Sequence, residues 1–264
     1  MAITLNGTTG ITTPALDSSG PLTSLGIDDN ATSTAITIDA SQNVGIGTAS
    51  PSTQDVSANN LVVEDIAGNG GITIKTPTSA YGSLHFSDGT GVDAYRGALA
   101  YNHADNTMQF STNATERMKI DSAGYVTKPY HPVASFSVSD GPISYATNQD
   151  VFAGKTTLVR ALQGITYTSA TGRFTVPVGG KYYIHFFSMK SGTVTAYFNV
   201  TINGAETAGL RIYNASGSTN WSPYGLGGIV TLAANDWINV ICSSSETNNA
   251  HGQSHLNFTA YLIG

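Results

Sequence analysis

Aromatic residues are distributed very unevenly along this 264-residue chain. Residues 1–80 contain none, residues 81–128 contain six, and residues 129–264 contain eighteen. Because aromatic side chains supply the largest buried areas of a protein core, only the C-terminal half has the material for a well-packed domain. The first 80 residues hold 19 Val, Ile, Leu or Met side chains, too few to offset the entropy lost on ordering them. We expect this segment to be disordered, or to be ordered by other copies of the chain or by another protein.

The composition favours strands and turns over helices. Gly, Ser, Thr and Asn account for 109 residues, or 41% of the chain, whereas only 28 residues are charged. Ser, Asn and Gly weaken helices, while Thr and the aromatic residues favour pleated strands. The sequence therefore predicts an all-β protein.

Several classes of protein fit the sequence poorly. The single cysteine, Cys242, argues against a disulfide framework and a cysteine-based zinc site, and it suits assembly in a reducing cytoplasm. No apolar run approaches the roughly 20 residues of a transmembrane helix, and the first residues lack a secretion pattern. Residues 1–128 carry a net charge of −7 and residues 129–264 one of +1, so neither half has a basic patch for nucleic acid. We expect neither membrane insertion nor nucleic-acid binding.

A short pattern occurs twice, 82 positions apart, and in each copy a strand, an acidic turn and a second strand follow one another. The matched pairs are Ile38 with Ile120, Asp39 with Asp121, and Val44 with Val126. Such a recurrence is typical of a shaft built from small β units. Alternating segments separated by turns lie between the copies and predict consecutive hairpins. The expected strands are residues 72–75, 83–86, 98–101, 107–110 and 117–120.

Residues 128–132 predict a stiff connector, because Pro129 and Pro132 fix the backbone and cannot donate to a strand ladder. After the connector the alternating segments are longer and more aromatic. The expected strands are residues 133–138, 173–176, 181–189, 194–202, 206–213, 228–232, 236–242 and 256–263. Asn203-Gly204 is the strongest hairpin signal in the chain. Eight strands of this kind fit a two-sheet jelly-roll sandwich.

The segment from 167 to 186 resembles the signature of complement C1q-like heads, which belong to the C1q and tumour necrosis factor superfamily. The signature combines spaced aromatic residues with a Gly-x-Tyr-x-Phe-x-Phe motif. The matching residues are Tyr167, Phe174, Gly180, Tyr182 and Phe186. Ile184 replaces one Phe, and the upstream positions, Thr156 and Leu162, depart from the pattern. The resemblance covers about half the chain, and it implies a homotrimer of jelly rolls with a binding surface.

The N-terminal half is similar to bacteriophage fibre proteins. Three segments, residues 5–12, 44–51 and 116–124, look like segments common in tail-fibre proteins of phages, especially marine ones. The animal C1q-like proteins sit on collagen stalks, whereas this chain has no Gly-X-Y repeat. The resemblance therefore implies a trimeric viral fibre in which residues 1–33 form an extended attachment segment and residues 34–128 form a β-rich shaft.

Three short motifs offer ligand chemistry, and for each the plain structural interpretation is favoured. Residues 154–156 resemble the end of a phosphate-binding loop but lack its first glycine and its helix. His251 and His255 lie in a Gly/Ser loop, where they could chelate a metal only if symmetry brought three copies to an axis. Residues 88–93 have oxygen ligands without the spacing of a calcium loop. We expect no metal and no cofactor.

Strand parity predicts where recognition takes place. It puts the tight turns at 203–205 and 233–235 beside the connector, and the long loops at 214–223 and 243–254 at the free tip, where binding residues usually lie. Their polar and aromatic side chains suit a sugar, although Trp221 and Tyr224 could instead cap the core or a trimer seam. The candidate receptor-binding residues are Asn214, Ser218, Asn220, Trp221, Tyr224, Glu246, Asn248, Asn249, His251 and Gln253.

Catalysis has little support, because the acidic residues of the C-terminal half fall on separate loops and strand ends and suggest no carboxylate pair for glycan cleavage. The sequence as a whole predicts a homotrimeric phage tail fibre. Its residues 1–33 would attach to a virion tail or portal-adaptor protein, and residues 129–264 would bind a host-surface glycan or protein. A capsid fibre and, with less support, a polysaccharide-depolymerising spike remain alternatives.

Overall fold

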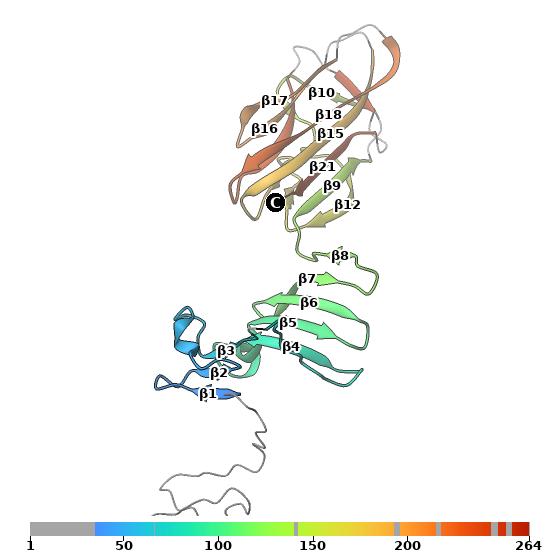
Figure 1. Cartoon of the computed structure of the whole chain (residues 1–264). Helices are drawn as coiled ribbons and strands as arrows, with labels where there is room; N and C mark the ends of the chain where they lie inside the picture. Colours follow the sequence, from blue (N-terminus) through green and yellow to red (C-terminus); the bar gives the residue numbers. More distant parts are fainter. Residues whose placement is uncertain are drawn as a thin grey trace, which may run out of the picture. The chain divides into compact units, whose positions relative to one another are not determined.

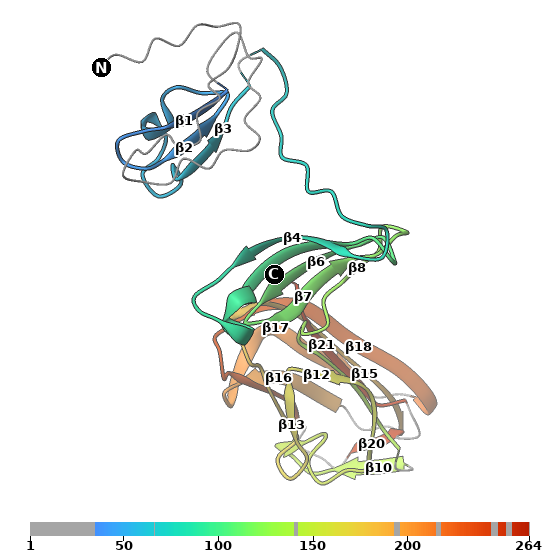
Figure 2. The ribbon, with the colours of Figure 1, turned by 90° about the horizontal axis from the view of Figure 1, so that it is seen from below.

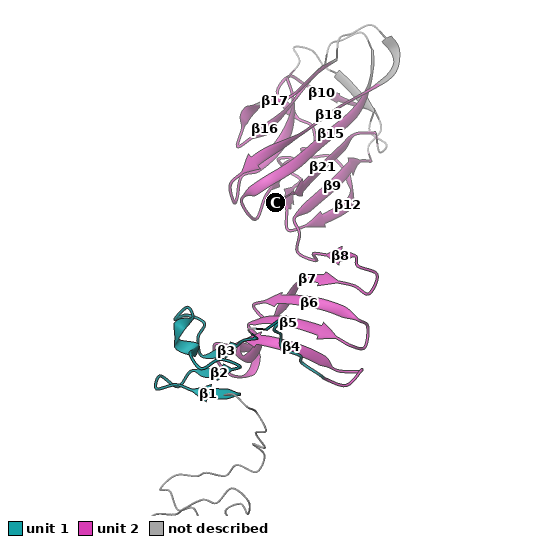
Figure 3. Cartoon of the chain, in the orientation of Figure 1, with its two compact units in different colours: residues 1–75 teal, residues 76–264 magenta. Residues whose placement is uncertain are grey.

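A computed structural model describes residues 35–264 except 66, 140–141, 193–195, 215–217, 244–247, 252–254 and 264 (Figure 1). The chain divides into two compact units, residues 1–75 and 76–264 (Figure 3). Strands and two short 3-10 helices are the regular elements of the described residues, which contain no α-helix. The expectation of an all-β protein is confirmed. The segment 1–33 lies outside the described residues.

The described part of the first unit is a small sheet that leaves apolar side chains uncovered. Its elements are β1 (Ile36–Ile38), β2 (Val44–Ile46), η1 (Pro51–Thr53) and β3 (Leu61–Val63). β1 pairs with β2 antiparallel, and β2 pairs with β3 parallel. Ile36 and Ile38 are 57% and 71% exposed, and an open hollow of about 520 Å³ beside β3 is lined partly by Leu61, Val63 and Ile72. The three short strands leave these apolar side chains exposed.

A five-stranded antiparallel sheet opens the second unit (Figure 2). Its strands are β4 (Tyr81–Phe86), β5 (Gly97–Asn102), β6 (Thr107–Thr112), β7 (Thr115–Ile120) and β8 (Val126–Thr127), and the 3-10 helix η2 (Gly91–Tyr95) lies between β4 and β5. Each strand pairs with the next, so four of the five expected segments are confirmed as strands of consecutive hairpins. The prediction for residues 72–75 was wrong, because these residues alternate as a strand would but have no partner strand.

The repeated pattern forms the same hairpin in both copies. The register pairs Ile38 with Val44 in the first copy and Ile120 with Val126 in the second. The Oδ1 atom of Asp39 accepts the backbone N–H groups two and four residues later, at 2.8 and 3.0 Å. The Oδ1 atom of Asp121 accepts the corresponding two, both at 2.9 Å. The Asp side chain thus imposes the turn in each copy by holding the loop's N–H groups.

The C-terminal part, which we call the head, is a sandwich of two antiparallel sheets. The first sheet has the order β10 (Pro142–Tyr145), β20 (Asn248–His251), β15 (Gly180–Gly192), β21 (Asn257–Leu262), β9 (Val133–Val138) and β12 (Thr157–Gln163), and β18 (Ser218–Leu232) also pairs with β15. The second has the order β13 (Thr166–Thr168), β14 (Arg173–Thr175), β19 (Trp237–Cys242), β16 (Ala196–Ile202) and β17 (Ala205–Asn214), and β11 (Gln149–Asp150) also pairs with β19.

This topology confirms the expected jelly-roll sandwich. Each of the eight expected strands overlaps a strand of the structure, and the chain crosses repeatedly between the two sheets, as it does in a jelly roll. The largest difference is β18, which begins at Ser218, ten residues before the expected start. β10, β11, β12, β13 and β20 were not predicted.

Aromatic side chains from both sheets fill the space between them. Along β15, Tyr182, Ile184 and Phe186 are fully buried, while the residues between them face outward. Phe174 of the second sheet stacks on Phe258 of the first, with ring centroids 4.2 Å apart. The concentration of aromatic residues after position 128 therefore builds one continuous core.

Candidate functional site

The two ends of the head differ, as strand parity predicted. Pairing of Gly180 with Leu232, of Tyr182 with Leu262 and of Tyr261 with Val133 places an end of β15, β18, β21 and β9 beside the connector. At the opposite end, which we call the tip, Gly192 pairs with Ser218 and Ser191 with Asn249. The tight turns therefore lie at the connector end, and the segments that carry the candidate receptor-binding residues begin or end at the tip (Figure 1).

The expected loop from 214 to 223 is for the most part a strand. Asn214 is the last residue of β17, and β18 already contains Ser218, Asn220 and Trp221. Ser218 pairs with Gly192 at the far end of β15, a strand whose length the sequence analysis underestimated. The candidate residues of this segment thus lie on extended backbone at the tip.

The second expected loop, from 243 to 254, contains the unpredicted strand β20. Asn248, Asn249 and His251 belong to this strand, which lies between β10 and β15. Glu246 and Gln253 lie outside the described residues. Among the described residues, no group of three or more His, Cys, Asp or Glu side chains is arranged to hold a metal ion. His255 follows the second loop and is exposed.

Tyr224 faces the core rather than a ligand, which corrects its assignment as a receptor-binding residue. Its side chain is 9% exposed, and its ring lies 5.4 Å from that of Phe198. Burial raises the pKa of its hydroxyl. The physical reason is parity, because Tyr224, Leu226 and Val230 alternate along β18 and share the inner face. The alternative interpretation of Tyr224 as a core-capping residue is confirmed.

The outward face of the second sheet carries a polar network that the sequence analysis missed. The Asn199 amide donates to Glu206 Oε1 and to Ser243 Oγ, both at 2.7 Å, and Arg211 Nε donates to Asn199 Oδ1 at 2.7 Å. Arg211 also forms an ion pair with Glu206 at 2.9 Å. These four side chains satisfy one another across β16 and β17, so the network stabilises the sheet surface and leaves no charge unpaired.

Asp150 is a largely buried carboxylate held by a tight turn. Its Oδ1 accepts the backbone N–H groups of Phe152 and Ala153 at 2.8 and 2.9 Å. Burial raises the pKa of this carboxyl above the usual value of 3.8. Gly172 makes room for it, since a Cβ there would lie 1.8 Å from Oδ1. The head therefore tolerates the charge at a cost in stability.

We expect Asp150→Asn to stabilise the head more at pH 7 than at pH 4. The folded-state pKa of Asp150 is raised, so its stabilising contribution is complete below the unfolded value of 3.8 and is lost as the pH rises through the folded-state pKa. Asn keeps an acceptor for the two N–H groups and never ionises. Thermal unfolding of both proteins at the two pH values measures this, and a melting-temperature gap that widens on acidification would contradict it.

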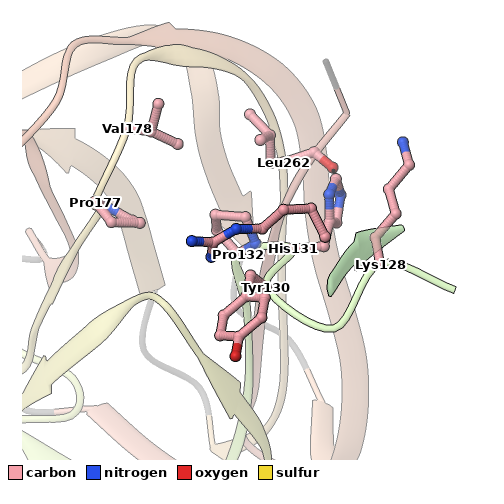
Figure 4. A pocket seen from close by; sticks show the side chains of 8 residues that line it. Lys128, Tyr130, His131, Pro132, Pro177, Val178 and Leu262 are labelled. Atoms are coloured by element: carbon pink, nitrogen blue, oxygen red, sulfur yellow. Dashed lines mark hydrogen bonds between the residues drawn. The ribbon is translucent and has the colours of Figure 1, made fainter. Parts of the chain in front are cut away.

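An open pocket of about 430 Å³ lies at the connector end of the head, and Figure 4 shows Pro177 and Val178 across it from Tyr130. The backbone N–H of Leu262 donates to the carbonyl of Pro132 at 3.1 Å, and the His131 ring is hydrogen-bonded to the Leu262 carbonyl. These contacts fix the connector against the end of β21. The lining residues are Arg117, Lys128, Tyr130, His131, Pro132, Pro177, Val178 and Leu262.

Comparisons with known proteins give distant similarities. The chain matches no protein-family model. It is 28% identical over 131 residues to an uncharacterized protein of Acanthamoeba polyphaga mimivirus, and the match covers 49% of this chain and 45% of that protein. The chain thus spans less than half the length of this relative.

Solved structures similar to the head include two from the C1q and tumour necrosis factor group. The Eiger tumour necrosis factor of S. frugiperda is 14% identical with a TM-score of 0.43, and the match covers 51% of this chain and 93% of that one. The globular domain of zebrafish complement 1qA is 16% identical with a TM-score of 0.42, over 50% and 98% of the two chains. The two-sheet fold of the head follows from its own strand pairing. In the described residues, no helix is long and apolar enough to span a membrane.

Proposed function

We propose that this chain is a homotrimeric virion fibre, specifically a bacteriophage tail fibre, whose head binds a receptor on the host-cell surface. The observation that carries the proposal is a series of uncovered apolar side chains in successive β modules. They include Ile38 in the first unit, Phe86 in the five-stranded sheet and Ile229 on the head, which are 71%, 68% and 64% exposed. Large exposed apolar side chains that gather on a surface often mark an interface.

The outward face of the first head sheet is suited to a second copy of the chain. Tyr183 and Tyr261 lie side by side with ring centroids 5.4 Å apart, and Ile229 pairs with Tyr183 on the next strand. Gly225 and Gly227 keep β18 flat, and a Cβ on Gly227 would lie 2.8 Å from the Tyr183 hydroxyl. An apolar, aromatic face of low relief packs well against copies of itself around a symmetry axis.

The viral location is supported by the mimivirus relative and by the three segments that resemble phage fibres. A C1q-like head agrees with the matched signature positions and with the jelly-roll topology. We assign residues 1–33 to attachment to a virion tail or portal-adaptor protein, residues 34–128 to the shaft and residues 129–264 to the head. Three tips on one fibre would add avidity, so each can bind weakly.

A glycan is the favoured receptor, because the tip segments are rich in neutral amides and hydroxyls and contain Trp221. A host-surface protein is the second possibility of the same class. The head carboxylates of Glu206, Asp236 and Asp150 are engaged by an Arg side chain, an Asn side chain and backbone N–H groups respectively. We propose binding without catalysis on this basis.

Replacing Trp221 by Ala together with Asn249 by Ala should lower adsorption of the fibre to host cells by at least about tenfold, since a central aromatic contact commonly contributes 2 kcal/mol or more. Purified fibre and labelled host cells give the measurement. Trp237→Ala is the matched control, because it removes the other tryptophan of the chain, which lies at the connector end under the Arg173 guanidinium. Equal adsorption of the double variant and the parent protein would remove the tip assignment.

Two further experiments separate the proposal from its alternatives. Electron microscopy of virions with antibody bound to the head distinguishes a tail fibre from a capsid fibre. Incubation of the purified protein with host polysaccharide distinguishes a binding protein from a depolymerising spike. Release of oligosaccharides would show that the chain is an enzyme and would contradict the proposal.

A further inference from the structure

The pocket at the connector end of the head is lined by two cationic side chains, those of Arg117 and Lys128. Among the described residues, the ion pairs with carboxylates are made by Arg96 and Arg211, and neither Arg117 nor Lys128 takes part in one. No carboxylate lines the pocket. The chain as a whole carries a net charge of −6, so this cluster is a local reversal of its charge. Such a reversal favours an anionic ligand.

Arg117 is held in an orientation that leaves its end groups for a ligand. Its Nε donates to Thr112 Oγ1 at 3.2 Å, and its guanidinium carbon lies 4.7 Å from the centroid of the Tyr130 ring. This hydrogen bond uses Nε alone, and the Tyr130 ring packs against the guanidinium group. Two terminal nitrogens fixed in this way match the two oxygens of a carboxylate, which is the pairing that arginine makes best.

The remaining walls are apolar and rigid. Pro132, Pro177, Val178 and Leu262 surround the charged groups, and a Cβ on Gly164 would lie 3.4 Å from the Cα of Pro132 and 3.5 Å from the ring of Pro177. The volume, about 430 Å³, falls in the roughly 300–1,000 Å³ range of small-molecule sites. A simple inorganic anion would leave these walls uncovered, whereas a ring that carries a carboxylate contacts both the walls and Arg117.

We propose that this pocket binds a carboxylated sugar residue of a host-surface polysaccharide, with Arg117 pairing with the carboxylate and Tyr130, Pro177 and Val178 packing against the ring. The inference rests on the proposed function, because it takes the ligand to be a glycan of the host surface. It adds a second sugar site, at the opposite end of the head from the tip. Binding of isolated oligosaccharides tests this second sugar site without host cells. A failure of the site is therefore distinguishable from a failure of the proposed host adsorption.

The test is calorimetric titration of the full chain with oligosaccharides carrying glucuronate or sialate, each compared with its carboxyl-reduced counterpart. We expect an acidic sugar to bind roughly ten- to a hundredfold more tightly than its reduced form, the loss that follows from removing a charge-assisted pair. Arg117→Ala should lose the same factor. Arg160→Ala is the matched control, because Arg160 Nε also donates to a hydroxyl at 3.2 Å, that of Ser137, outside the pocket.

Val178→Asp provides a second variant that does not depend on removing Arg117. Val178 is 44% exposed, so an Asp there is compatible with folding and places a negative charge in the pocket. We expect it to abolish binding of the acidic sugar while the melting temperature stays within a few degrees of the parent protein. Equal affinity for every acidic sugar and its reduced form, unchanged binding in both variants, or equally effective competition by inorganic phosphate would each overturn the proposal.

Discussion

Phe174→Ala is expected to destabilise the head by about 3–5 kcal/mol, the usual cost of deleting a fully buried aromatic side chain. Phe174 lies on the second sheet and reaches across the core, so the substitution opens a cavity between the sheets. Its relative exposure is 0%, and four rings surround it. The ring centroids lie 5.1 Å away for Phe136, 5.7 Å for Phe152, 4.8 Å for Tyr167 and 4.2 Å for Phe258.

Chemical denaturation followed by near-ultraviolet circular dichroism measures this loss, because the signal reports the aromatic core. Phe174→Leu is the control that keeps an apolar side chain, and we expect it to cost substantially less than the Ala variant. A loss below about 1 kcal/mol for Phe174→Ala would show that the two sheets do not share the core described here.

Tyr261→Asp is expected to convert the proposed trimer into monomers. Tyr261 is 40% exposed beside Tyr183 on the outward face of the first head sheet, where the proposal places copies against one another. In a trimer the substitution would bury three unpaired carboxylates, each costing several kcal/mol. Analytical ultracentrifugation of the variant should then give a mass near 27.4 kDa for the whole chain.

Tyr213→Asp is the matched control for Tyr261→Asp. Tyr213 is 54% exposed and contacts Tyr197 with ring centroids 4.6 Å apart, but it lies on the second sheet, which faces away from the first. The control should keep the mass of the parent protein. Equal dissociation by both variants would indicate general destabilisation, and a trimer that survives Tyr261→Asp would place the interface on another surface.

Local turn chemistry made much of the fold predictable. Asp39 and Asp121 impose the same turn because each carboxylate holds two backbone N–H groups, and that requirement is visible in the repeated sequence. Asn203 and Gly204 have φ of 52° and 82°, the left-handed conformations that a two-residue hairpin needs. Turn signals of this kind depend on a few neighbouring residues, so they can be recognised in the sequence alone.

The strands that escaped prediction depend on distant partners. β12 exists because it pairs with β9, with a register shift between Val159 and Ala161 that disturbs its alternation. β20 is short and polar, and it forms between β10 and β15, which are remote from it in sequence. The same dependence explains why residues 72–75 do not form a strand. Their sequence alternates, but no described strand pairs with them.

The candidate site was predictable only in part. The tip position follows from strand parity, and the burial of Tyr224 could have been found by counting back in steps of two from Leu232 along β18. The network around Asn199 could not have been predicted. The register shift between Asn199 and Thr201 decides which residues of β17 lie beside Asn199. The pocket beside Arg117 also depends on long-range closure, since the connector meets the end of β21 there.

The central claim is that copies of this chain cover one another's apolar faces, and sedimentation equilibrium of the purified chain tests it most directly. The account predicts one species with a mass three times the 27.4 kDa of the chain, unchanged on dilution through the micromolar range. A single species of 27.4 kDa under the same conditions would contradict the trimeric fibre and the interface assigned to Tyr183, Ile229 and Tyr261.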